Sequence, residues 1–149
     1  MKRREFLAIA TLLLYKPLSA KTNIRSIDII QSVIEHMLPG VNLREYFFTI
    51  PYDKYFDKND AVDLDKGAKE LFLNNKNFLL LDDKEKERAL REFEDSENGR
   101  YWLSLLLNYG LEAMLGDPIY GGNKDKKGWK LLHHHPGRPR PKMKYGKNG

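Results

Sequence analysis

The chain has 149 residues, with 26 Lys and Arg against 21 Asp and Glu, and it contains no cysteine. This length indicates one domain with a modest core, and the lack of cysteine excludes disulfides, attached c-type haem, iron–sulfur clusters and thiolate zinc sites in this chain. The charge is uneven, because residues 124–149 hold nine basic residues and one acidic residue, whereas residues 21–123 hold 13 basic and 19 acidic residues.

The first twenty residues have the layout of a secretory signal peptide. A basic start is followed by an apolar run from Phe6 to Tyr15 and by a small-residue exit at Ser19-Ala20. Ten helical residues cover roughly 15 Å, which is about half of a bilayer core. We therefore expect cleavage after Ala20 and a soluble mature protein of residues 21–149.

Within this leader, Arg3, Arg4, Phe6 and Leu7 fit the twin-arginine consensus, in which two arginines are followed at fixed offsets by Phe and Leu. Lys2 stands where that consensus usually has Ser or Thr. The alternative is an ordinary secretory signal that happens to contain two arginines. We favour the twin-arginine interpretation, which makes the twin-arginine translocase a partner and the periplasm the expected location.

The mature chain is predicted to be all-α, with a small helical bundle over residues 21–116. Apolar residues at helical spacing predict a helix over residues 24–38, ended by Pro39-Gly40. Residues 41–59 are rich in aromatic residues and are interrupted by Pro51, so we expect an irregular connector that is packed by its rings and has room for one helical turn. A second helix is predicted over residues 60–74, with Val62 among the residues on its apolar side.

Capping residues mark two further helices. Asp82 precedes Glu85 by three positions, a capping-box pattern that predicts a helix running to Phe93 or Glu94. Ser96 is placed to cap the last helix, which ends at Gly116. No segment has a strong strand pattern. Residues 117–149 are rich in glycine, proline and lysine, so we predict a long, irregular, basic C-terminal arm.

The stretch from Asp117 to Gly137 combines tight turns with large rings. Its Asp-Pro and Gly-Gly-Asn runs favour turns in which glycine adopts positive φ. Tyr120 and Trp129 are rings of the kind that anchor protein interfaces. A phosphate-binding loop is not supported, because no strand precedes the glycines and no Lys followed by Ser or Thr leads into a helix.

This stretch resembles the C-terminal signature of the gluconate 2-dehydrogenase subunit 3 family, in which Asp-Pro-x-Tyr-Gly-Gly-Asn is followed by Gly-Trp-Lys and then by Pro-Gly. The twin-arginine leader and the helical middle extend the resemblance. Lys124 stands where family members often have Arg, and residues 133–135 replace a more apolar stretch. The residues that carry the signature, and that we expect to contact a partner, are Asp117, Pro118, Tyr120, Gly121, Gly122, Asn123, Gly128, Trp129, Pro136 and Gly137.

The resemblance implies a cofactor-free, non-catalytic small subunit of a periplasmic dehydrogenase acting on gluconate or another sugar. The large partner subunit would bind FAD and perform the chemistry, and a membrane-bound cytochrome c subunit with haem would pass the electrons on. The small subunit would support folding, stability and co-export of the flavoprotein. The alternative is a freestanding periplasmic binding or chaperone-like protein; an enzyme acting alone comes third, because no catalytic constellation is recognisable.

Two tracts near the C-terminus raise the question of a metal site and of an anionic partner. His133, His134 and His135 are adjacent, and adjacent side chains on an extended segment point to opposite sides, so a solvated or packing role is favoured over a metal site. The basic run 138–147 alternates with prolines, which favours an extended chain. An acidic protein surface is the favoured partner of this run, and anionic lipid headgroups or a merely solvated tail are the alternatives. Nucleic acid is not expected, because an exported protein rarely meets it.

Overall fold

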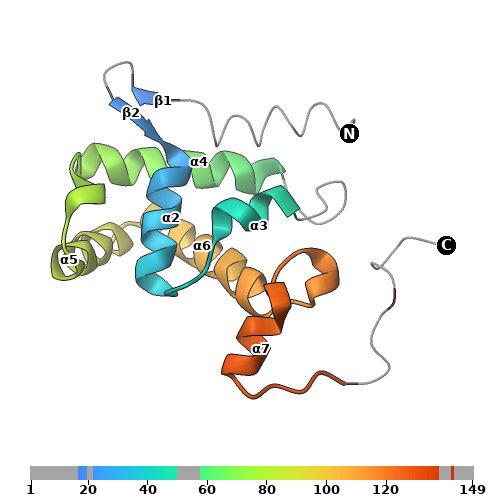
Figure 1. The fold of residues 1–149 in the computed structure, drawn as a ribbon. Helices are drawn as coiled ribbons and strands as arrows, with labels where there is room; N and C mark the ends of the chain where they lie inside the picture. The colour runs from blue at the N-terminus through green and yellow to red at the C-terminus, as the bar shows by residue number, and fades with distance from the viewer. Residues whose placement is uncertain (1–16, 20–21, 50–57, 138–141, 143–149) are drawn as a thin grey trace.

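The structure, a computed structural model, describes residues 17–19, 22–49, 58–137 and 142. The export-motif residues and most of the basic run 138–147 lie outside these ranges. The all-α prediction is confirmed, because helices make up most of the described chain (Figure 1). They are α2 (Ser26–Met37), α3 (Leu43–Thr49), α4 (Lys58–Asn74), α5 (Asp83–Glu94), α6 (Glu97–Leu115) and α7 (Lys127–Leu131).

The core of the bundle lies where α2 packs against both α4 and α6, with α5 packed on α6 (Figure 1). Helical spacing of apolar residues places one face of α2 inside, as predicted. The fully buried aliphatic residues of this core are Ile27, Ile29, Ile30, Val33 and Ile34 of α2, Leu43 of α3, Leu64, Ala68 and Leu71 of α4, and Leu106 of α6.

Trp102 joins three helices. It is 1% exposed, and its indole Nε1 donates to the carbonyl oxygen of Leu64 on α4 at 2.9 Å. Its ring meets Phe93 of α5 edge to face, with ring centroids 5.8 Å apart. The indole therefore fixes α6 against α4 and α5 together.

A polar network crosses the core between α2 and α4. The buried hydroxyl of Ser26 donates to Oδ1 of Asp65, and Lys69 Nζ lies 2.5 Å from Oδ2 of the same carboxylate. A buried carboxylate requires such partners, because an unpaired charge in the interior is strongly destabilising. The network therefore specifies how the start of α2 sits on α4.

The predicted caps of α5 and α6 are confirmed. Asp82 Oδ1 accepts from the backbone N–H of Glu85 at 2.8 Å, and Glu85 Oε2 accepts from the N–H of Asp82 at 3.0 Å. Ser96 Oγ accepts from the N–H of Gly99 at 2.9 Å. These side chains satisfy N–H groups that have no partner within the helix, so both helices begin where the sequence indicates.

A short antiparallel ribbon precedes the bundle, although no strand was predicted. Strand β1 (Pro17–Ser19) pairs with β2 (Thr22–Arg25), and β2 includes the first two residues of the helix expected over 24–38 (Figure 1). Strand β1 falls within the predicted signal peptide.

Two predictions for the middle of the chain were wrong. Residues 43–49, expected in an irregular connector, form α3, which buries Tyr46 and Phe47. A helix of seven residues has little stability alone, so the burial of these rings stabilises it. Val62, expected on the apolar side of α4, is 45% exposed.

The prediction of little regular structure after Gly116 was wrong for residues 118–131. They form two 3₁₀ turns, Pro118–Tyr120 and Lys124–Lys126, followed by α7. Helix α7 lies against α6 (Figure 1). We refer to residues 117–131 as the closing segment, since they fold back over the C-terminal end of α6.

A candidate partner-binding groove

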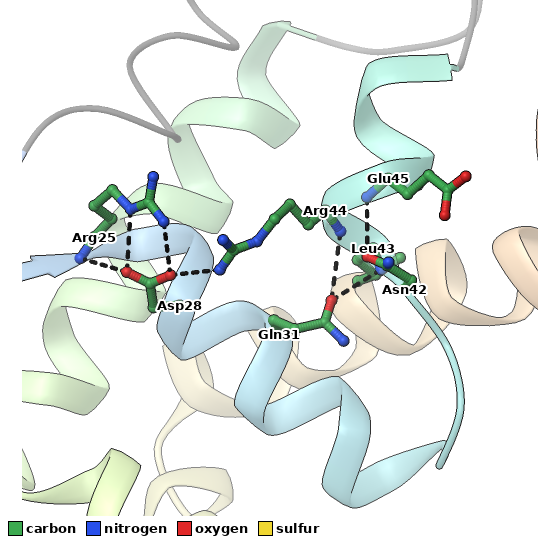
Figure 2. Close-up of polar contacts among 7 residues, drawn as sticks. All are labelled: Arg25, Asp28, Gln31, Asn42, Leu43, Arg44 and Glu45. Atoms are coloured by element: carbon green, nitrogen blue, oxygen red, sulfur yellow. Dashed lines mark hydrogen bonds and ion pairs between the residues drawn. The ribbon is translucent and has the colours of Figure 1, made fainter.

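Asp28 of α2 binds two arginines (Figure 2). Arg25 Nε donates to Asp28 Oδ2 at 3.2 Å, and Arg44 Nη2 donates to Oδ1 at 2.5 Å. Burial raises the pKa of Asp28, but the hydrogen bonds and charge of the arginines outweigh this effect and lower its pKa below the ordinary carboxyl value. The ionised carboxylate therefore ties the start of α2 to the start of α3.

Gln31 and Asn42 cap the first turn of α3 (Figure 2). Gln31 Oε1 accepts from the N–H groups of Leu43 at 3.0 Å and Arg44 at 3.4 Å. Asn42 Oδ1 accepts from the N–H of Glu45 at 3.0 Å. These N–H groups have no partner within the helix, so both amides cap α3, and Gln31 also fixes it to α2.

Glu45 and Tyr46, the next two residues of α3, contact the closing segment and α6 respectively. Lys124 Nζ donates to Glu45 Oε1 at 2.9 Å, and the Tyr46 hydroxyl donates to Glu112 Oε2 at 3.2 Å. Burial, together with the nearby Glu112 carboxylate, raises the pKa of Tyr46 well above its ordinary value, so the phenol stays a neutral donor. Helix α3 thereby links α2 to the closing segment.

Asn123 organises the closing segment. It is 3% exposed and adopts a left-handed conformation with φ of 45°, which Asn tolerates better than most residues. Its backbone N–H donates to the carbonyl oxygen of Ala113 at 2.5 Å, and its Oδ1 accepts from the N–H of Gly128 at 2.9 Å. Among the described residues, its buried Nδ2 has no hydrogen-bond acceptor.

Gly122 and Gly128 lie directly against the backbone of α6. A Cβ at position 122 would lie 2.7 Å from the carbonyl oxygen of Glu112, and one at position 128 would lie 1.9 Å from that of Met114. Such separations are shorter than real Cβ atoms allow. Any larger residue at either position would push the closing segment away from α6.

Trp129 fastens α7 to the end of α6. It is 7% exposed, and its Nε1 donates to the carbonyl oxygen of Leu115 at 2.6 Å. The ring of His134 packs on it at a centroid distance of 5.8 Å. The indole thus satisfies a carbonyl in the last turn of α6, where no intrahelical donor remains.

These contacts leave a groove of about 930 Å³ between the α2–α3 loop, α3, the end of α6 and the closing segment. Its size lies within the range of known small-molecule and cofactor pockets. The rim carries both signs of charge, from Glu45, Lys124, Asp125 and Lys127. The apolar lining comes from Pro39, Val41, Tyr46, Ala113, Met114 and Leu131.

No family model, curated protein or solved structure matches this chain. Among the helices of the described ranges, none is long and apolar enough to cross a membrane. Within the same ranges, no three His, Asp or Glu side chains gather closely enough to hold a metal ion, and residues 133–135 are exposed.

The structure divides the residues of the predicted interface into two groups. Five line the groove: Pro118, Gly121, Gly122, Asn123 and Gly128. The other five do not line it. Asp117 caps the first 3₁₀ turn by accepting from the N–H of Ile119 at 3.0 Å, and Tyr120 beside it is half-buried. Trp129 is buried against α6, and Pro136 and Gly137 follow α7.

The opposite wall of the groove was missed by sequence reasoning. It comes from residues 39–46, which precede the closing segment by the whole of α4, α5 and α6. The aromatic richness of residues 41–59 was the available signal, but it indicated only ring packing. Nothing in the local pattern places Pro39 or Val41 opposite Asn123.

Proposed function

We propose that this chain is the non-catalytic small subunit of a periplasmic, FAD-dependent gluconate or sugar dehydrogenase. It binds the catalytic flavoprotein, stabilises it and accompanies it through the twin-arginine translocase. A membrane-bound cytochrome c subunit with haem completes the complex in this proposal. The partner's pocket, and not this chain, selects the sugar.

The observation that carries the proposal is the position of the signature residues 117–129. They resemble the family's C-terminal motif, and five of the interface residues proposed from it line the groove. An internal packing role explains Gly122, Gly128 and Trp129, whereas Pro39 and Leu131 line the groove and are exposed. The groove is therefore the surface that we assign to the flavoprotein.

A freestanding periplasmic binding protein is the second candidate. The groove volume of about 930 Å³ falls in the range of small-molecule sites, and its mixed lining suits an amphipathic ligand. This candidate requires no permanent protein partner. The two functions are therefore separated by what accompanies the chain when it is purified from its native host.

The first experiment is purification of the tagged chain from that host, followed by measurement of bound flavin and of acceptor-dependent gluconate or sugar oxidation. Pro39 is exposed at the rim of the groove, so Pro39→Arg should reduce the recovered flavoprotein about tenfold by placing a charge in an apolar contact. Leu80→Arg is the matched control, because Leu80 is 85% exposed and lies outside the groove. Recovery without any flavoprotein would reject the proposal.

The second experiment tests co-export. A twin-arginine signal suits a protein that folds around its cofactor before export. Residues 21–149 contain no glycine-rich dinucleotide fingerprint, so in this proposal the signal serves the flavoprotein. Replacing Arg3 and Arg4 with lysines should hold both subunits and the dehydrogenase activity in the cytoplasm, provided that the flavoprotein has no signal of its own. Active flavoprotein in the periplasm of that strain would contradict shared export.

A further inference from the structure

Two adjacent leucines at the end of α7 face solvent. Leu131 is 72% exposed and Leu132 is 55% exposed, although the neighbouring Trp129 is buried against α6. The apolar contact that holds α7 is thus made by the indole, and the two leucines contribute little to it. Apolar residues that are exposed next to one another and rimmed by polar residues are a feature of surfaces that contact a partner or a membrane.

Lysines surround these leucines. Lys126, Lys127 and Lys130 are exposed, and none of them forms an ion pair with another described residue. Lys124 differs, since it is paired with Glu45. Asp125 is the only acidic residue among residues 124–149, which contain nine basic residues, so this end of the molecule attracts anions.

The combination of lysine and leucine favours a lipid bilayer over a protein as the partner of this surface. Protein interfaces are depleted in lysine at their centre, and their energetic hot spots contain tryptophan, tyrosine and arginine more often than leucine. An anionic bilayer attracts lysine through its surface potential and accepts aliphatic side chains at the headgroup boundary. The one tryptophan of this region is already buried inside the chain.

We propose that Leu131 and Leu132, together with Lys126, Lys127 and Lys130, form a surface that binds anionic phospholipid bilayers. The lysines contact the headgroups, and the two leucines insert at the boundary with the acyl chains. This proposal goes beyond the proposed function, because it requires neither a flavoprotein nor a cytochrome. Leu131 and Lys127 also line the edge of the groove, so a bound flavoprotein would compete with the bilayer for these two residues.

The absence of cysteine allows a local test on the full chain. Leu132→Cys is labelled with an environment-sensitive fluorophore and mixed with vesicles of phosphatidylcholine alone or of phosphatidylcholine and phosphatidylglycerol in equal amounts. We expect a blue shift and increased emission only with the anionic vesicles, and loss of this response at high salt. Leu80→Cys, labelled in the same way, should not respond, since Leu80 is exposed on another part of the surface.

Both labelled proteins contain the apolar run at the start of the chain. A response at position 132 but not at position 80 is therefore due to the surface at the end of α7 and not to that run. Replacing Lys126, Lys127 and Lys130 with Gln should weaken the response at position 132 about tenfold or more in lipid concentration, because each lysine near an anionic bilayer contributes to binding. An unchanged label at 132, an equal response at 80, or a response to an acidic protein but not to the anionic vesicles would overturn the proposal.

Discussion

Gly67 of α4 lies in direct contact with the indole of Trp102 on α6. A Cβ at position 67 would be 2.0 Å from Trp102 Cδ1 and 2.5 Å from Nε1, closer than real Cβ atoms come. The indole has no freedom to move away, because it is 1% exposed and its Nε1 is bonded to Leu64. A glycine that weakens α4 by its helix propensity is therefore required by the packing of α4 on α6.

Gly67→Ala should destabilise the protein despite the better helix propensity of alanine. Overpacking of a filled core costs about 1–3 kcal/mol, and a separation of only 2.0 Å indicates the upper part of this range. The cost therefore exceeds the gain of about 1 kcal/mol from replacing glycine in a helix. Urea unfolding followed by circular dichroism measures the difference. Gly137→Ala is the matched control and should be neutral, because a Cβ at that position meets nothing within 4 Å. Equal stabilities of the two variants would contradict this packing argument.

Trp129→Ala should loosen the closing segment. Removing a buried tryptophan costs about 3 kcal/mol or more, and the carbonyl of Leu115 also loses its donor. Hydrogen exchange at the amides of Asn123 and Gly128 should accelerate, since both are bonded within this region. Leu131→Ala should leave these rates unchanged, as Leu131 is 72% exposed. Unaltered exchange in Trp129→Ala would show that the indole does not fasten the segment.

Two variants separate the side-chain and backbone contributions of Asn123 to stability. Asn123→Gly keeps the left-handed backbone but leaves the buried N–H of Gly128 without an acceptor, at a cost of about 1–3 kcal/mol. Asn123→Ala loses the same acceptor and adds the strain of a left-handed conformation, about 1–2 kcal/mol more. Denaturant unfolding should therefore rank the wild type above Asn123→Gly and Asn123→Gly above Asn123→Ala. The reverse order of the two variants would exclude a backbone contribution.

Acid should remove the contribution of Asp28 to stability. Its folded pKa lies below the ordinary value of 3.8, so its ion pairs stabilise the protein above that pH and are lost as the pH falls through the lowered pKa. The effect should be below about 1 kcal/mol, because Arg44 is 40% exposed and solvent screens the pair. Urea midpoints of the wild type and Asp28→Asn should differ near neutral pH and converge in acid.

Glu94→Gln provides the control for this series, since Glu94 is exposed and forms no ion pair with another described residue. Its midpoints should follow those of the wild type across the same pH range. A gap between wild type and Asp28→Asn that persists unchanged at low pH would assign the difference to packing and not to charge.

The all-α class, the starts of α5 and α6 and the end of α6 could be predicted from the sequence. Each depends on residues close together in the chain: Asp82 bonds Glu85 three positions on, and Ser96 bonds Gly99 at the same spacing. The buried face of α2 follows from helical periodicity in the same way. Such short-range interactions need no knowledge of the rest of the fold.

Tertiary structure alone decided the roles of α3, Gly67 and the closing segment. Helix α3 is too short to be stable by propensity and is held by Gln31, Asp28 and the burial of Tyr46. The sequence predicts that Trp129 contacts a partner, yet the residue is buried against the end of α6. Half of the residues of the predicted interface lie outside the groove. These outcomes depend on contacts between segments far apart in the chain, where the free energy of burial is set by the partner surface and not by the local residue pattern.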